Sequence, residues 1–233
     1  DDVESRGLGD VYKRQYMNQF RLGIPMALQN VLIAIGGMVL TSAVNRYGTY
    51  FLAGFTAMNK LYGVLEISAV SYGYAMVTYT GQNYGAKRYD RIKSGVKKVV
   101  LLSLATSILI SIILWFFGPF FLSCFISNTS QGAKEAMTYG LTFLRCLTIF
   151  LPILYMLHAY RSTIQGLSNA FIPMVSGLFE LMMRISGALV LPIFFGKSGL
   201  YPVEVLAWVG AVVILIPSYY HMERNFQNVS ENS

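Results

Sequence analysis

The sequence contains six apolar stretches, each long enough to cross a lipid bilayer as a helix. They cover approximately residues 22–45, 50–80, 98–126, 136–165, 167–195 and 201–221. A membrane-spanning helix needs about 20 predominantly apolar residues. Only 12% of the residues are charged and 55% are hydrophobic, whereas soluble domains average roughly 25% charged residues. The sequence therefore predicts an all-α integral membrane protein, a bundle of six transmembrane helices with short polar joints.

The first residues of the chain differ in origin from the rest. Residues 5–15, SRGLGDVYKRQ, resemble codon for codon the translation of a sequencing-library adaptor. We therefore treat residues 1–15 as a non-native, adaptor-derived segment and base no expectation of fold on them. The natural reading frame is then expected to continue upstream of Tyr16. This predicts that the remaining residues are the C-terminal part of a longer protein.

Basic residues are concentrated on one set of joints. If residues 81–98 are cytoplasmic, the same side receives nine Lys and Arg residues: Arg21, Lys87, Arg88, Arg91, Lys93, Lys97, Lys98, Arg161 and Arg224. The opposite joints hold three: Arg46, Lys134 and Lys197. Cytoplasmic loops of membrane proteins carry the excess of Lys and Arg. The bias predicts a chain that starts and ends in the cytoplasm, with residues 224–233 as a cytoplasmic tail.

The joint at residues 81–98 is called the elbow below. Its sequence, GQNYGAKRYDRIKSGVKK, lacks the G-x-x-x-x-G-K-[ST] spacing of a phosphate-binding loop. Six basic residues beside two membrane helices are typical of a topology signal. No nucleic-acid partner is therefore expected. Apolar side chains recur at three- and four-residue spacing, at Ala86, Tyr89, Ile92 and Val96. This spacing predicts a short helix lying in the headgroup region.

Several motifs in order resemble one transporter family. They are AMVTYTGQNYGAKRYDRIKSGVKK around the elbow, LGIPMALQ in the first apolar stretch, NKLYGVLE at 59–66, YRSTIQGLSNAFIP at 160–173 and ELMMRI at 180–185. The chain resembles the C-terminal lobe of the multidrug and toxic compound extrusion (MATE) transporters. The elbow motif that carries most of this resemblance consists of Gly81, Gln82, Asn83 and Gly85. The resemblance covers residues 16–223.

The resemblance implies a function. MATE transporters have two six-helix lobes that alternate between inward-open and outward-open states, and they export small amphiphilic organic cations in exchange for Na⁺ or H⁺. It implies that this chain is one lobe, helices seven to twelve, of a multi-pass antiporter in the inner (plasma) membrane of a bacterium. The expected partners are the lipid bilayer, the missing N-terminal lobe and the organic cation. No cofactor beyond the coupling ion is expected, and no enzymatic activity.

One departure from the family pattern concerns the coupling ion. Some bacterial members carry a carboxylate in the first span of this lobe and another in the fourth. The corresponding positions here are Ile33 and Leu154. Coupling then depends either on an aspartate of the first lobe or on other acids of this chain, and both alternatives stay open.

Ionisable residues inside the predicted spans are candidates for the substrate or ion pathway, because a charge near the bilayer midplane needs a partner or a function. Glu180 and Arg184 are four residues apart and are expected to form an ion pair on one helix face. Lys60 and Glu66 are six residues apart, so each must face another helix or a water-filled cleft. Glu66 is the best acidic candidate for attracting a cation.

Polar side chains complete the set of candidates. Gln29, Asn30 and Asn59 are expected to line the cavity or to join helices by hydrogen bonds. Arg161, near a span end, is expected to extend its guanidinium to the headgroups. His158 is expected to be a packing residue.

Other function classes have less support in the sequence. A flippase for lipid-linked saccharides, from the same superfamily, would be expected to have a more cationic cleft, for which Lys60 alone is weak support. A non-catalytic membrane subunit also remains open. The sequence lacks H-E-x-x-H, G-x-S-x-G and paired aspartates, so no catalytic residues are predicted. No metal site is predicted, because Cys124 and Cys146 lack ligand spacing.

Overall fold

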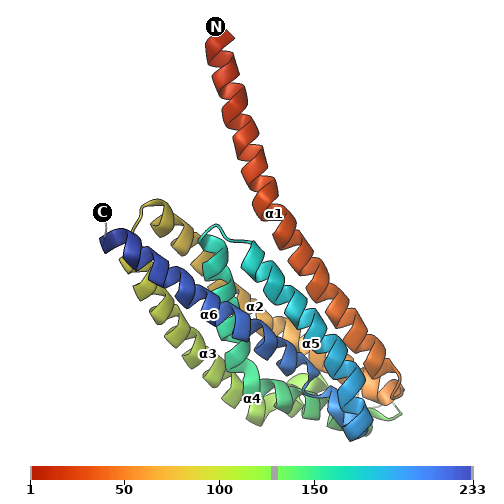
Figure 1. Ribbon diagram of the computed structural model, residues 1–233. Coiled ribbons are helices and arrows are strands. Elements are labelled where there is room, and N and C mark those ends of the chain that lie inside the picture. Colours follow the sequence, from red (N-terminus) through yellow and green to blue (C-terminus); the bar gives the residue numbers. More distant parts are fainter. Residues whose placement is uncertain (1, 127–130, 232–233) are drawn as a thin grey trace.

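The computed structural model describes the backbone of residues 2–126 and 131–231, and the side chains of that part except at 2–12, 14, 18 and 227–231. Its helices are α1 (Asp2–Asn45), α2 (Thr49–Gly85), α3 (Tyr89–Ser123), α4 (Ala133–Gly166), α5 (Phe171–Phe195), the short 3-10 helix η1 (Gly196–Leu200) and α6 (Val203–Glu231). The predicted all-α fold is confirmed, and the described residues contain no strand. Figure 1 shows the helices running roughly along one direction.

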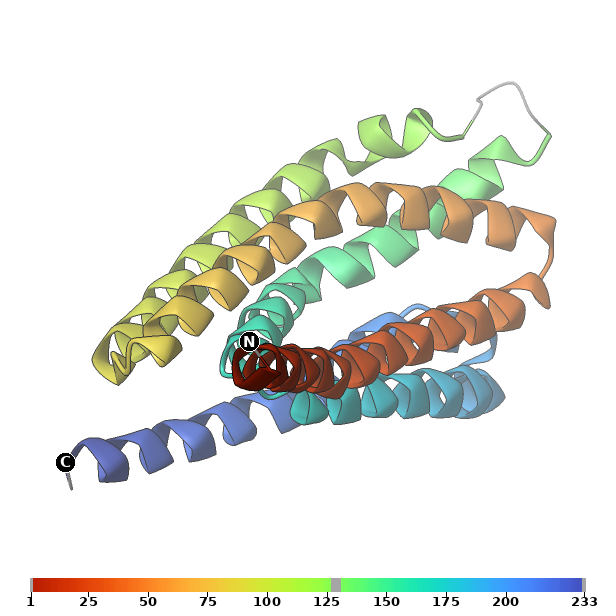
Figure 2. The same ribbon diagram turned by 90° about the horizontal axis from the view of Figure 1, so that it is seen from above.

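The helices form two groups of three. Helices α2, α3 and α4 pack together on one side, and α1, α5 and α6 on the other, as the view in Figure 2 shows. Contacts between α4 and α6 join the groups, with a smaller contact between α1 and α2. The space between the groups is where the polar side chains of the spans gather.

Small residues set the close approach of α2 to α4. A Cβ atom built on Gly54 would lie 2.5 Å from the carbonyl oxygen of Ala136, and one on Gly73 would lie 2.6 Å from Oγ of Ser162. Glycine at these positions lets the two helix backbones meet, as is common in membrane helix packing. The distance between α2 and α4 is therefore fixed by backbone contact.

In the part of the chain that the structure describes, five helices are long and apolar enough to cross a membrane: Gln15–Asn45, Tyr89–Ser123, Ala133–Gly166, Phe171–Leu200 and Val203–Phe226. The other long helix, α2, has 37 residues and packs against α3 and α4. It is more polar than the five spans because it contains Asn59, Lys60 and Glu66. Large apolar side chains point outward along α3, among them Leu101, Phe116 and Phe120. Such a surface suits acyl chains of a bilayer, and the chain is a multi-pass membrane protein.

Residues 86–88 of the elbow form a tight turn and its other residues belong to α2 and α3, so the prediction of a separate headgroup helix is wrong. Helix α2 ends at Gly85 and α3 begins at Tyr89. Lys87 takes a left-handed conformation with φ 57°. Its N–H donates to the carbonyl oxygen of Tyr84 at 3.0 Å, and the Arg88 N–H donates to that of Asn83 at 2.8 Å. These two bonds terminate α2, which lets α3 start at once.

Helix α6 continues past the predicted span end at residue 221 and reaches back to the elbow. The ring of Phe226 stacks on Tyr89, with centroids 4.8 Å apart and planes inclined by 7°. Lys93 of α3 forms an ion pair with Glu223 at 2.9 Å. The segment from residue 224, predicted to be a tail, continues α6 as a helix through Glu231.

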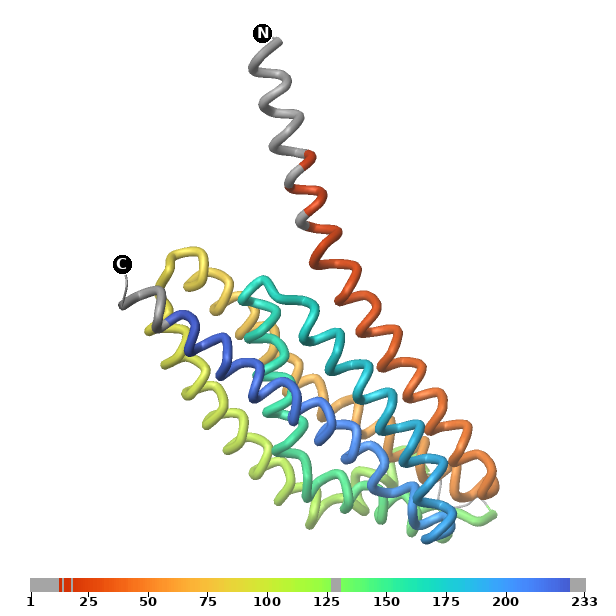
Figure 3. Tube along the Cα trace, in the orientation of Figure 1, coloured from red at the N-terminus to blue at the C-terminus, as the bar shows by residue number. Residues whose placement is uncertain are grey.

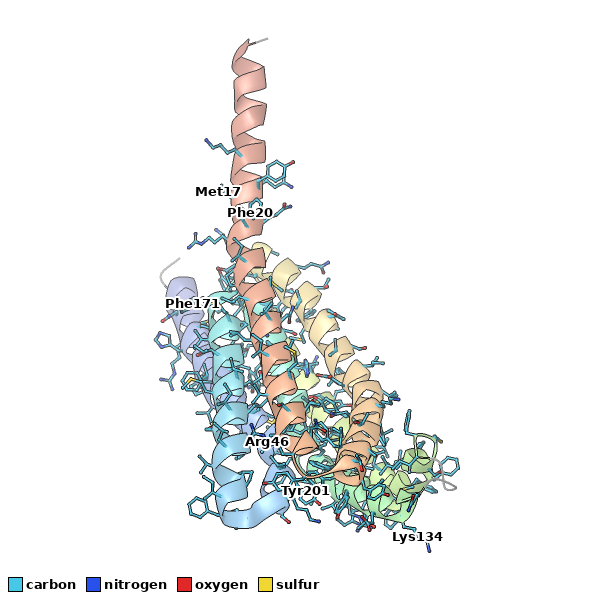
Figure 4. The ribbon with its side chains drawn as sticks, turned by 90° about the vertical axis from the view of Figure 1, so that its right-hand side faces the viewer. Met17, Phe20, Arg46, Lys134, Phe171 and Tyr201 are labelled. Carbon is cyan, nitrogen blue, oxygen red and sulfur yellow. The ribbon has the colours of Figure 1, made fainter. Side chains whose placement is uncertain are left out.

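Helix α1 runs without a break from the adaptor-like segment into the bundle. Tyr16, Met17 and Phe20 are exposed, and this part of α1 extends beyond the other helices in Figure 3. Most side chains of residues 1–15 lie outside the described residues. Figure 4 places Met17, Phe20 and Phe171 toward one end of the molecule, with the remaining labelled residues, Arg46, Lys134 and Tyr201, toward the other.

Candidate functional site

A cavity of about 540 Å³ lies between the two helix groups. It is lined from α1, α2, α4, α5 and α6, and its polar or ionisable side chains are Gln29, Asn30, Tyr62, Glu66, Tyr74, His158, Arg161, Ser162, Gln165, Glu180 and Arg184. Apolar side chains, among them Trp208, complete the wall. Apolar walls with a few convergent polar groups are typical of small-molecule sites.

Four charged side chains form a continuous chain across three helices. Arg161 of α4 donates to Glu180 of α5, and Nη1 of Arg184 lies 3.5 Å from the other Glu180 oxygen. Arg184 also donates from Nε and Nη2 to both oxygens of Glu204 on α6, at 3.0 and 2.6 Å. The first three side chains are less than 8% exposed. Their charges are compensated pairwise, as burial of ions requires.

The expected pair of Glu180 and Arg184 therefore exists, but it is part of a larger chain. Arg161 does not extend to the headgroups as predicted: it is 7% exposed and points inward to Glu180. A buried carboxylate one helix away attracts the guanidinium more strongly than a distant headgroup can. Helix α1 approaches this chain through Gly36, where a Cβ atom would lie 2.9 Å from Cδ of Arg184.

Glu66 faces a histidine. Its Oε1 lies 3.6 Å from Nε2 of His158, and the pair joins α2 to α4 across the cavity wall. The side chain of Glu66 is 36% exposed and that of His158 14% exposed. Glu66 thus faces another helix and a cavity, as its position on α2 predicted, whereas His158 is a cavity group rather than a packing residue.

Two amide side chains of α1, Gln29 and Asn30, line the cavity, and they differ in exposure. Gln29 is buried, and its Oε1 accepts from Nε2 of Gln165 at 3.3 Å. Asn30 is exposed and lines the cavity. Ile33 and Leu154, which match the coupling carboxylates of other family members, line the same cavity as apolar side chains.

Two of the proposed pathway residues lie elsewhere. Asn59 and Lys60 are exposed on α2 and do not line the cavity. The elbow residues lie at the end of α2, where Gly81 passes close to α4 and Nδ2 of Asn83 donates to the carbonyl oxygen of Tyr79 at 2.8 Å.

The sequence reasoning missed Glu204 and Gln165 and misjudged Arg161 and His158. Each of these four side chains has its partner on a different helix, so the spacing of residues along one helix does not predict the contact. For Glu204 the sequence offered a different indication, because an acidic residue stands at the start of a membrane helix. Among the described residues, no group of three or more His, Cys, Asp and Glu side chains is arranged to hold a metal ion.

The charges in and beside the cavity nearly balance. They belong to Glu66, Arg161, Glu180, Arg184 and Glu204. Two arginines and three glutamates leave one net negative charge when the neighbouring histidine is uncharged. Glu66 is the carboxylate of this set that has no arginine within ion-pair distance among the described residues. The surplus charge is therefore centred on Glu66.

Solved structures establish the fold family. A structure described as the crystal structure of MATE in complex with MaL6 matches with a TM-score of 0.82 and 18% identity, covering 91% of this chain and 47% of that one. A structure described as the inward-facing conformation of a multidrug resistance MATE family transporter matches with a TM-score of 0.76 and 18% identity, covering 92% of this chain and 48% of that one. Likeness at this identity concerns the fold alone.

Similar curated proteins are described as probable multidrug resistance proteins. The probable multidrug resistance protein YoeA of Bacillus subtilis (strain 168) is 24% identical over 208 residues, which are 86% of this chain and 42% of YoeA. The probable multidrug resistance protein YpnP of the same strain is 29% identical over 134 residues, 58% of this chain and 29% of YpnP. The chain thus spans less than half the length of these relatives. The MatE family model matches residues 25–190, more than half of the chain, and the chain therefore belongs to the MatE family of multidrug transporters.

Proposed function

We propose that this chain is the C-terminal lobe of a cation-coupled antiporter that exports small amphiphilic organic cations by alternating access. The partner is the N-terminal lobe, and the coupling ion is Na⁺ or H⁺. The proposed location is the inner (plasma) membrane. The observation that carries the proposal is the cavity between the two helix groups, which has an apolar wall and a surplus negative charge at Glu66.

The chemistry of the cavity suits an amphiphilic cation. Aromatic rings at Tyr62, Tyr74 and Trp208 line it, and ring faces attract cations. Glu66 is partly exposed, so a ligand can reach its carboxylate. The two arginines at the cavity are each held by a carboxylate, so their charges are compensated and offer little attraction to a pyrophosphate headgroup. The flippase alternative is not favoured, because Lys60 lies outside the cavity.

Two ions of equal shape and opposite charge test the proposal. The purified chain in detergent micelles is dialysed to equilibrium against tetraphenylphosphonium or tetraphenylborate, with empty micelles as the reference. We expect the phosphonium to bind more tightly once partition into micelles is subtracted. Neutralising Glu66 in Glu66→Gln should weaken phosphonium binding by roughly ten-fold, about 1.4 kcal/mol. Lys60→Gln, on the same helix but outside the cavity, is the matched control and should bind as the parent does.

The result that contradicts cation selectivity is equal or tighter binding of the borate. Transport gives a second test of the half-transporter proposal. Because alternating access moves one lobe against the other, residues 16–233 expressed alone should insert into the membrane yet give no ion-coupled efflux of ethidium. Efflux by this chain alone would overturn the need for a second lobe.

A further inference from the structure

Among the described residues, Glu66 and His158 form the one contact at the cavity between a carboxylate and a histidine, the side chain that acts as a charge switch near neutral pH. Its two members come from α2 and α4, and both line the cavity. The arginines and the other glutamates of the cavity are held in the four-residue chain described above. The charge of the cavity near neutral pH therefore depends on this pair.

Among the described residues, charged and titratable groups line or border the cavity from α2, α4, α5 and α6, whereas α1 contributes the polar groups Gln29 and Asn30. Besides the pair itself, they are Tyr62 and Tyr74 on α2, Arg161 on α4, Glu180 and Arg184 on α5, and Glu204 on α6. Phenols and guanidiniums keep their ordinary charge at neutral pH. The two glutamates are each held by arginine in an ion pair.

The arrangement has room for one additional positive charge. With an uncharged imidazole, three carboxylates face two guanidiniums, and the cavity carries a surplus of one negative charge. A proton on the imidazole cancels that surplus at a distance of 3.6 Å from the carboxylate. An organic monocation in the cavity would cancel it equally well. Both charges together would leave the cavity positive in a medium of low dielectric constant, which is unfavourable.

We propose that His158, held beside Glu66, is the proton-binding site of this lobe, and that a proton there and an organic monocation in the cavity exclude one another. This inference rests on the proposed function and names its coupling ion and the residue that holds it. The proton adds to the neutral imidazole, and the resulting imidazolium donates Nε2–H toward Oε1 of Glu66. Entry of the organic cation releases this proton to water, so one positive charge is exchanged for one.

The chain has only two histidines, His158 and His221, which makes a direct test possible. The chain is labelled with ¹⁵N-histidine in detergent micelles, and both imidazole signals are followed at about pH 6, within the range in which histidine serves as a pH-dependent charge. Tetraphenylphosphonium should move the His158 signal toward that of the neutral ring, because linkage between two ligands is reciprocal. His221, which is exposed beyond the cavity, is the internal control and should not move. An unchanged His158 signal at saturating phosphonium would overturn the proposal.

Calorimetry in two buffers of different ionisation enthalpy counts the protons released on binding. We expect up to one proton per phosphonium at about pH 5.5 and almost none at about pH 8, with affinity rising about ten-fold over that range. In His158→Gln both the release and the pH dependence should disappear. Persistence of proton release in that variant would assign the proton to another group and overturn the proposal.

A ligand-free measurement separates this inference from the proposed function. Glu66→Gln removes the negative partner of the imidazolium, so the His158 signal at about pH 6 should move toward that of the neutral ring. If the phosphonium binds to no form of the chain, the proposed substrate class is wrong, and this measurement still decides whether the pair holds a proton. If Glu66→Gln leaves the His158 signal unchanged, the pair of Glu66 and His158 does not hold a proton, and the inference is wrong.

Discussion

Glu180 is the carboxylate that two arginines share, so its neutralisation tests the buried charge chain most directly. In Glu180→Gln, Arg184 keeps its bonds to Glu204 at 2.6 and 3.0 Å. Among the described residues, Arg161 keeps only the 3.4 Å bond to Ser176. A unit charge pair at the 3.5 Å of Arg184–Glu180 interacts by about 5 kcal/mol at an effective dielectric constant of about 20. Leaving one buried charge without its partner costs about 3–5 kcal/mol, and we expect the free energy of unfolding to fall by this amount.

Double variants identify which arginine depends on Glu180. Glu180→Gln with Arg161→Gln removes both charges of one pair and leaves the contact between Arg184 and Glu204 intact, so the loss should shrink to about 1–2 kcal/mol. Glu180→Gln with Arg184→Gln leaves Arg161 and Glu204 each without an ionic partner among the described side chains. That double variant should be at least as unstable as Glu180→Gln alone.

Unfolding by SDS in mixed micelles, followed by the fluorescence of the buried Trp208 in a Trp115→Phe background, measures these differences. Arg91→Gln is the matched control, because it removes an exposed basic side chain and should change stability by no more than about 0.5 kcal/mol. Equal recovery in the two double variants, or a loss below about 1 kcal/mol in Glu180→Gln, would refute the assignment of Glu180 as the shared partner.

Three further predictions concern the helix contacts, the turns and the topology. Gly54→Ala should lower the free energy of unfolding by about 1–3 kcal/mol, because the added methyl group meets the backbone of α4. Gly63→Ala, on the same helix, places its methyl group in open space and should raise the free energy of unfolding by about 0.5–1 kcal/mol. Similar SDS unfolding midpoints for the two variants would contradict this. Ser168→Gly should stabilise by up to about 1 kcal/mol, since Ser168 has φ 61°, and a lowered midpoint would argue against strain there. In a background without the native cysteines, Arg88→Cys and Lys134→Cys should react with impermeant thiol reagents from opposite sides of the membrane, and reaction from the same side would exclude the topology.

The six long helices could be predicted from the six apolar stretches. Among the described residues, however, five of these helices are long and apolar enough to cross a membrane, and α2 is not among them. Their ends were less predictable. The third stretch was expected to begin near residue 98, yet α3 begins at Tyr89. The elbow residues looked like a separate amphipathic helix because the first turns of a membrane helix, half in water, have the same spacing of apolar side chains.

The candidate site was predictable only where its partners share a helix. Glu180 and Arg184 are four residues apart, so their contact follows from helix geometry. The contacts of Arg161 with Glu180, and of Glu66 with His158, join different helices. They depend on how α4 packs against α5 and α2, which no spacing within one segment encodes. Asn59 and Lys60 were named for their polarity, but the rotation of α2 turns them away from the cavity.

The close contact of Gly73 with Ser162 bears on how the neighbouring pair of Glu66 and His158 responds to a change of charge. Gly73 lies two turns along α2 from Glu66, and Ser162 lies one turn along α4 from His158. Because α2 at Gly73 packs directly against the Ser162 side chain of α4, close packing keeps the carboxylate and the imidazole from shifting. If His158 binds the proton as proposed, the proton would arrive and leave with little movement of heavy atoms at this pair, and the reorganisation energy of the exchange would be low.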